Sequence, residues 1–112
     1  MKPATRVLVV DDERFFREAI RDVLKWHAEE PGDWQAVWKR INEKYHVNRD
    51  YRRFSCTQGD FNIDAKINAA YIVIGMLYGE GDFGKTLDIS TRCGQDSDCN
   101  PSTAAGVLGT MI

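Results

Sequence analysis

Two aspartates near the C-terminus of this 112-residue chain have the clearest potential for chemistry. Asp96 and Asp98 alternate in the run Cys93-Gly-Gln-Asp96-Ser-Asp98-Cys99-Asn100. In an extended loop, residues two apart direct their side chains to the same side. Carboxylate oxygens suit Mg²⁺, which usually takes one or two protein carboxylates and keeps several waters. The spacing therefore supports a Mg²⁺ site, while the alternative, that both residues simply cap the next helix, stays open at this point.

Cys99 directly follows this pair. A neutral thiol is a poor partner for Mg²⁺, so its role as a ligand stays open. Next to a helix N-terminus, the pKa of a thiol can instead be lowered. The more ordinary interpretation is a cysteine that packs in the core.

A second acidic pair, Asp11 and Asp12, follows the apolar run Val7-Leu-Val-Val10. A short run of this composition predicts a buried strand over residues 6–10. Acids at the end of a strand can hold Mg²⁺, or they can simply end the strand and cap the following helix.

The elements that must position these residues are helices. Apolar residues recur at helical spacing from residue 13 to about 28, and Asp33 is a good N-cap for a second helix. Further helices are expected from residue 64 to the glycines at 79 and 81, from Asp82 to near residue 94, and from Asn100 onward. Residues 46–62 show no periodicity and predict a loop.

Two features of the last helix lead to further expectations. Gly106 and Gly109 would allow it to approach the helix over residues 68–77 closely. It is still apolar at Ile112, with no capping glycine, which predicts a truncated chain.

Composition limits the class of protein. The chain is 43% hydrophobic and 29% charged with a net charge of −2, which predicts one small domain and excludes a disordered tail. No run reaches the roughly 20 apolar residues that cross a bilayer, and three cysteines without zinc-like spacing suit a reducing cytoplasm. Residues 39–53 are basic with interleaved aromatics, but the chain is mildly acidic overall, so a nucleic-acid partner is not expected.

Residues 60–112 resemble the C-terminal portion of ADP-ribosylglycohydrolases, and residues 31–59 match more loosely. The resemblance rests on four segments: Asn68-Ala-Ala-Tyr-Ile-Val-Ile-Gly-Met-Leu-Tyr-Gly79, Gly81-Asp-Phe-Gly-Lys-Thr-Leu87, Cys93-Gly-Gln-Asp-Ser-Asp-Cys-Asn100 and Ala105-Gly-Val-Leu-Gly109. It implies an all-helical fold that uses two Mg²⁺ ions to hydrolyse the bond between ADP-ribose and a modified acceptor. ADP-ribose or an ADP-ribosylated molecule would be the substrate.

Carried over residue by residue, the resemblance makes Asp96 and Asp98 the metal-ligating aspartates. Cys99 stands where that family often has a threonine ligand. The family completes its site with an N-terminal acidic cluster of Thr-Asp-Asp type, which does not occur in this sequence. No catalytic residue is therefore assigned, and the activity of the chain stays open.

Residues 5–25 resemble the start of a response-regulator receiver domain, in which Asp11 and Asp12 would bind Mg²⁺ for phosphotransfer. The later strands of a receiver, with its phosphoacceptor, cannot be found. The two resemblances together predict a chimera: a receiver-like strand and helix over residues 1–28, and hydrolase-like helices over residues 29–112, forming one small domain.

The predicted fold is mainly α, with one short N-terminal strand. The predicted function is that of a Mg²⁺-binding helical fragment derived from an ADP-ribosylglycohydrolase. The alternatives are a receiver-like signalling module and a non-catalytic, self-associating interaction domain. A homo-oligomer is expected, because a single strand needs a partner and the apolar last helix needs a cover.

Overall fold

The computed structural model describes residues 14–48 and 65–111, and these residues are helical without strands. The elements are α2 (Arg14–Glu29), α3 (Trp34–Ile41), the π-helical turn η1 (Asn42–Val47), α5 (Ala65–Gly79), α6 (Phe83–Arg92) and α7 (Cys99–Met111). The mainly α prediction is confirmed for this part of the chain. The strand predicted over residues 6–10 lies outside the described residues, as do Asp11 and Asp12.

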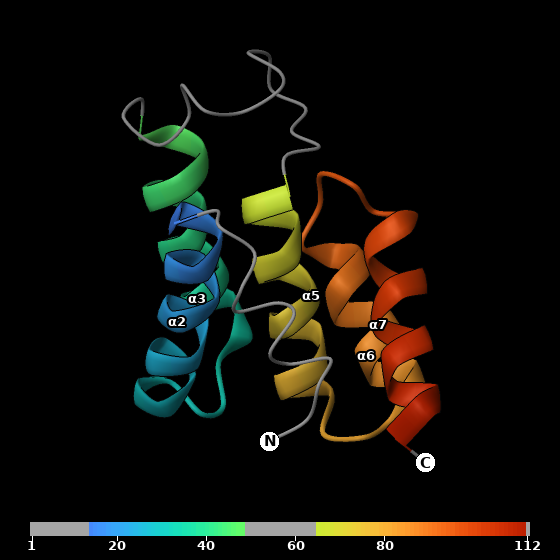
Figure 1. Cartoon of the computed structure of the whole chain (residues 1–112). Coiled ribbons are helices and arrows are strands. Elements are labelled where there is room, and N and C mark those ends of the chain that lie inside the picture. Colours follow the sequence, from blue (N-terminus) through green and yellow to red (C-terminus); the bar gives the residue numbers. More distant parts are fainter. Residues whose placement is uncertain (1–13, 49–64, 112) are drawn as a thin grey trace.

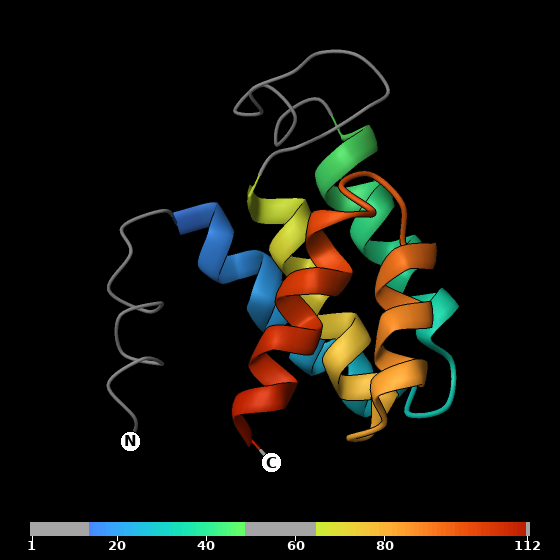
Figure 2. The same cartoon turned by 90° about the vertical axis from the view of Figure 1, so that its right-hand side faces the viewer.

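Helix α5 is the centre of the bundle. It stands between the pair α2–α3 on one side and the pair α6–α7 on the other (Figure 1). Figure 2, turned by 90°, shows α7 lying along α5 and α6. A helix that is apolar around its whole circumference must be covered on all sides. Accordingly the buried side chains of α5 lie on several faces and include Ile67, Ala70, Tyr71, Ile74 and Tyr78.

The core on the N-terminal side joins α2, α3 and η1. Ala19 and Val23 of α2 are buried against Val37 and Ile41 of α3, in the same cluster as the apolar residues of α5. Spacings of four residues put each pair on one face of its helix. Within the described ranges, no helix is both long and apolar enough to cross a membrane.

The turn η1 overlaps the start of the loop predicted over residues 46–62. Its Tyr45 is buried, and the phenol donates to Asp22 of α2, whose carboxylate also lies 2.7 Å from the Lys44 ammonium. This anchoring keeps the chain helical to Val47, so the loop prediction is wrong for residues 46 and 47. Residues 49–62 lie outside the described residues.

The closest helix packing occurs between α5 and α6, at Gly75 and Gly79. A Cβ atom at Gly79 would lie 2.0 Å from Thr86 Oγ1, and one at Gly75 would lie 2.8 Å from the Cβ atom of Ser90. Glycine is therefore required by close approach at both positions. The prediction for Gly106 and Gly109 is wrong, because Gly106 has no atom within 4 Å of such a Cβ and Gly109 meets only the edge of Phe83 at 4.0 Å.

Capping residues set the starts of two helices, α3 and α6. Asp33 accepts from the Ala36 N–H at 3.1 Å, and Asp82 accepts from the Lys85 N–H at 2.9 Å, which confirms both predicted N-caps. The last helix begins at Cys99, one residue before the predicted Asn100. Asn100 is not its cap, because its side chain is buried in a hydrogen bond to α5.

Because the thiol of Cys93, at the C-terminal end of α6, is buried, we expect the protein to lose stability at alkaline pH. Burial raises the pKa of its thiol to about 12, whereas an unfolded cysteine ionises near about 8.5. Between these values the unfolded chain loses a proton that the folded chain keeps. The contribution of the Cys93 thiol to the free energy of unfolding is therefore complete below about pH 8.5. Above this pH the contribution falls by up to about 1.4 kcal/mol per pH unit.

Urea unfolding at intervals from pH 8 to 11 measures this slope. The control is Cys93→Ala, which should show a shallower decline between pH 9 and 11 than the parent. Equal slopes for the two proteins would contradict the assignment to Cys93.

Candidate metal centre

Asp96, Asp98 and Cys99 converge in the segment that links α6 to α7. One carboxylate oxygen from each aspartate and the Cys99 sulfur all lie within 4.8 Å of one another. In the described part of the chain, this is the one group of at least three acidic, cysteine or histidine side chains with such spacing. The structure thus brings together the three residues that the sequence singles out at this end of the chain.

The convergence comes from a turn, not from the predicted extended loop. Gly94 and Gln95 have φ values of +88° and +59°, in the left-handed region, and they reverse the chain after α6. The Ser97 N–H then donates to the Gln95 carbonyl and the Asn100 N–H to the Asp96 carbonyl, each at 2.9 Å. The two carboxylates thus lie close together because of this turn, and not because of the alternation of Asp96 and Asp98 in an extended loop.

Asn68, in the first turns of α5, holds this segment in place through two hydrogen bonds. Its side-chain oxygen accepts from the Asp96 N–H at 3.2 Å and from the Asn100 side-chain amide at 2.9 Å. Both asparagines are buried, so the pair joins the start of α5 to the start of α7 out of contact with water. Asn68 was not among the functional residues predicted from the sequence, although a lone asparagine in a strongly apolar helix is the signal that could have found it.

Asp98 is favoured as an anion. Hydrogen bonding with the Asp96 side chain lowers the pKa of Asp98, and the backbone N–H groups of Asp98 and Cys99 lower it further. The Cys99 N–H donates to Asp98 Oδ1 at 3.0 Å. At the start of α7, the Cys99 N–H thus donates to Asp98 and the Asn100 N–H donates to the Asp96 carbonyl. These two N–H groups are therefore not available to bind a phosphate from outside the turn.

Cys99 is exposed, so it is not the packing cysteine that its sequence context suggests. A hydrogen bond to Asp96 raises the pKa of its thiol, and the negative charges of Asp96 and Asp98 raise it further. The alternative of a lowered pKa is therefore wrong, because the two neighbouring carboxylates outweigh the helix N-terminus. A neutral thiol adds little to the binding of a hard cation.

The two carboxylates fit Mg²⁺ and the thiol does not. Oxygen ligands at about 2.1 Å in an octahedron lie about 3 to 4 Å apart, a separation within the 4.8 Å span of the group. The partial exposure of Asp96 and the exposure of Asp98 leave room for the waters that Mg²⁺ retains. In a Mg²⁺ site at this turn, the two aspartates would supply two ligands, and the remaining protein ligands would come from elsewhere.

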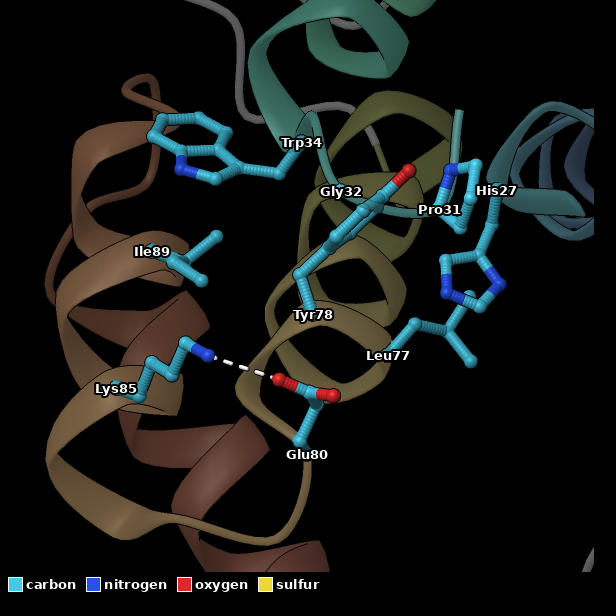
Figure 3. Close-up of a pocket in the computed structure, with 9 residues that line it drawn as sticks. All are labelled: His27, Pro31, Gly32, Trp34, Leu77, Tyr78, Glu80, Lys85 and Ile89. Carbon is cyan, nitrogen blue, oxygen red and sulfur yellow. Dashed lines mark hydrogen bonds and ion pairs between the residues drawn. The ribbon is translucent and has the colours of Figure 1, made fainter. Parts of the chain in front are cut away.

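A separate cleft of about 190 Å³ lies where α2, α3, α5 and α6 meet (Figure 3). The side chains drawn in the figure include His27, whose ring lies edge-on to Tyr78 at 4.8 Å, and Lys85, whose ammonium lies 2.8 Å from Glu80. Tyr78 donates to the Glu30 carbonyl. The cleft is smaller than the roughly 300 Å³ at which ligand pockets begin, and its two charged side chains, Glu80 and Lys85, pair with each other. It is therefore better described as a structural junction than as a site.

Comparison with known proteins gives one match. A model of the ADP-ribosylglycohydrolase family matches residues 4–112. No curated protein and no solved structure matches the chain significantly. The match starts before the segment over residues 5–25 that resembles a receiver domain, so it gives no support to a separate origin for that segment.

Proposed function

Because the chain belongs to the ADP-ribosylglycohydrolase family, we propose that Asp96 and Asp98 bind Mg²⁺ for the hydrolysis of an ADP-ribosyl bond. The observation that carries the proposal is the convergence of both carboxylates within 4.8 Å, in a turn held by the buried Asn68. The substrate class is ADP-ribose attached to an acceptor group.

Each residue has a distinct part in this proposal. Asp96 and Asp98 bind the metal, and Asn68 positions Asp96 through its backbone N–H. Mg²⁺ held by these residues would supply Lewis-acid chemistry, through polarisation of a substrate oxygen or activation of water. The Thr-Asp-Asp-type cluster with which the family completes its site does not occur in this sequence, and the catalytic residues are not assigned.

Backbone amide shifts in a Mg²⁺ titration test the metal site. We expect saturable shifts clustered at residues 94–100, and at least about 10-fold weaker binding in Asp96→Asn and Asp98→Asn. Asp88→Asn, which removes an exposed carboxylate from α6, is the matched control and should bind as the parent does. Shifts confined to residues 10–13 would contradict the proposal and favour the receiver-like use of Asp11 and Asp12.

The reaction is tested separately with ADP-ribosylated arginine and serine substrates. We expect Mg²⁺-dependent release of ADP-ribose that is lost in Asp96→Asn. Saturable binding at residues 94–100 without release from any substrate would restrict the proposal to a metal-binding module.

A second candidate function, self-association, has its own observation. Four large apolar side chains of α6 and α7 are 39–69% exposed, namely Phe83, Leu87, Val107 and Met111. We propose that a second copy of the chain covers them, because exposed apolar side chains on neighbouring helices mark association surfaces.

Sedimentation equilibrium should show a dimer that Leu87→Glu dissociates. Leu24→Glu is the control, because Leu24 is 50% exposed but lies on α2, across α5 from this surface (Figure 1). A parent protein that stays monomeric, or equal dissociation in both variants, would contradict the self-association.

A further inference from the structure

A second cleft, of about 310 Å³, lies between α3 and the C-terminal end of α6. Its lining consists of Trp34, Gln35, Trp38, Lys39 and Arg92. We propose that this cleft binds a purine nucleotide, with the base against the indole rings and a phosphate between Lys39 and Arg92. The volume is at the lower end of the range for ligand sites, which suits one base with its sugar phosphate and not a larger ligand.

The aromatic wall is held in place by the fold. Trp34 and Trp38 are four residues apart and therefore lie on one face of α3. The Trp38 indole N–H donates to the Cys93 carbonyl at 2.8 Å, which fixes that ring against the end of α6. Base stacking on such a ring contributes about 1–3 kcal/mol per base.

The cations of the cleft are placed for an anion beside an aromatic ring. The Arg92 guanidinium lies 5.4 Å from the centre of the Trp34 ring. Its acidic neighbour is Asp88, at 3.6 Å, and both side chains are more than half exposed. An exposed ion pair of this kind contributes little, so a phosphate can displace it.

The cleft is adjacent to the candidate metal centre along the chain. Trp38 contacts Cys93, and Asp96 is three residues further on, a reach of at most about 11 Å. An ADP-ribosyl group contains a purine nucleotide and could thus reach from this cleft toward the Asp96 turn. The inference deepens the proposed function and rests on it for the choice of ligand.

Tryptophan fluorescence measures binding directly, because two of the three tryptophans line the cleft. ADP is titrated in EDTA, so that the metal centre takes no part. We expect saturable quenching by ADP, and binding at least about 10-fold weaker for adenosine and for inorganic pyrophosphate, each of which lacks one half of the recognised group. No saturable quenching would overturn the proposal, as would equal affinity for pyrophosphate and ADP.

Variants assign the binding to this cleft. Arg92→Gln and Lys39→Gln should each weaken ADP binding about 10-fold, since each removes one charged hydrogen bond to phosphate. Lys25→Gln, an exposed charge on α2, is the matched control and should leave the affinity unchanged. Equal weakening in all three would show attraction by net charge alone and overturn the proposal.

Asp96→Asn separates this inference from the proposed function. It should abolish the Mg²⁺ response and leave ADP quenching in EDTA intact. Loss of ADP quenching in this variant would overturn the proposal that the cleft binds ADP independently of the metal turn. Failure of the parent protein to bind Mg²⁺, with ADP quenching intact, would overturn only the metal site.

Discussion

Asn68→Ala is expected to lower the free energy of unfolding by about 2–4 kcal/mol and to abolish the response of residues 94–100 to Mg²⁺. The change removes one oxygen that accepts from both the Asp96 N–H and the Asn100 amide. Asn100 is buried and would be left without this acceptor in a place that water does not reach. The metal response is lost because the backbone N–H of Asp96 is no longer held.

Urea unfolding and the Mg²⁺ titration check this result together. Asn68→Asp is the comparison, because it keeps the oxygen that accepts both bonds; it also buries a carboxylate, so it should recover only part of the stability. The double variant Asn68→Ala/Asn100→Ala should cost less than the sum of the single changes, with a coupling of about 1 kcal/mol. Strict additivity would show that the two side chains do not act as a pair.

Gly79→Ala is expected to destabilise the bundle by about 1–3 kcal/mol, although alanine is the better helix former. The added methyl group would lie 2.0 Å from Thr86 Oγ1 and 2.9 Å from the Cα atom of the same residue. A side chain can rotate away, but the backbone of α6 can move only by separating from α5. Overpacking at this contact therefore exceeds the gain in helix propensity.

Gly106→Ala is the matched control, and it should raise the free energy of unfolding where Gly79→Ala lowers it. Gly106 lies in an exposed part of α7, and a Cβ atom there meets nothing within 4 Å. Only the propensity gain remains, about 1 kcal/mol of added stability. Thermal unfolding of the two variants gives the comparison, and a higher melting temperature for Gly79→Ala would contradict the close contact of α5 with α6.

The helices could be predicted from sequence because their signals are local. Asp33 and Asp82 cap the helices that their positions indicate, since an N-cap needs only the next three residues of the chain. The apolar character of α5 likewise predicts its burial. Asp96 and Asp98 were identified as candidate ligands by residue type and spacing, and the structure brings their carboxylates together.

What could not be predicted depends on contacts between distant segments. Asn68 is 28 residues from Asp96 and 32 residues from Asn100, so no local pattern shows that it holds the turn. Glycines occur in both α5 and α7, and only the packing shows that the close approach uses Gly75 and Gly79. The aromatic cleft was missed because Trp38 and Arg92 lie on separate helices.

The central position of α5 also bears on the order in which the bundle assembles. Its contacts with α6 and α7 form between segments that follow it directly, across short connections at residues 80–82 and 93–98. Its contacts with α2 join segments separated by η1 and by residues 48–64. Closing the longer stretch of chain costs more entropy, so we expect the C-terminal helices to form first and α2 and α3 to dock on them later. The acidic turn, whose residues all lie in α5–α7, would then be one of the first parts of the molecule to acquire its native shape.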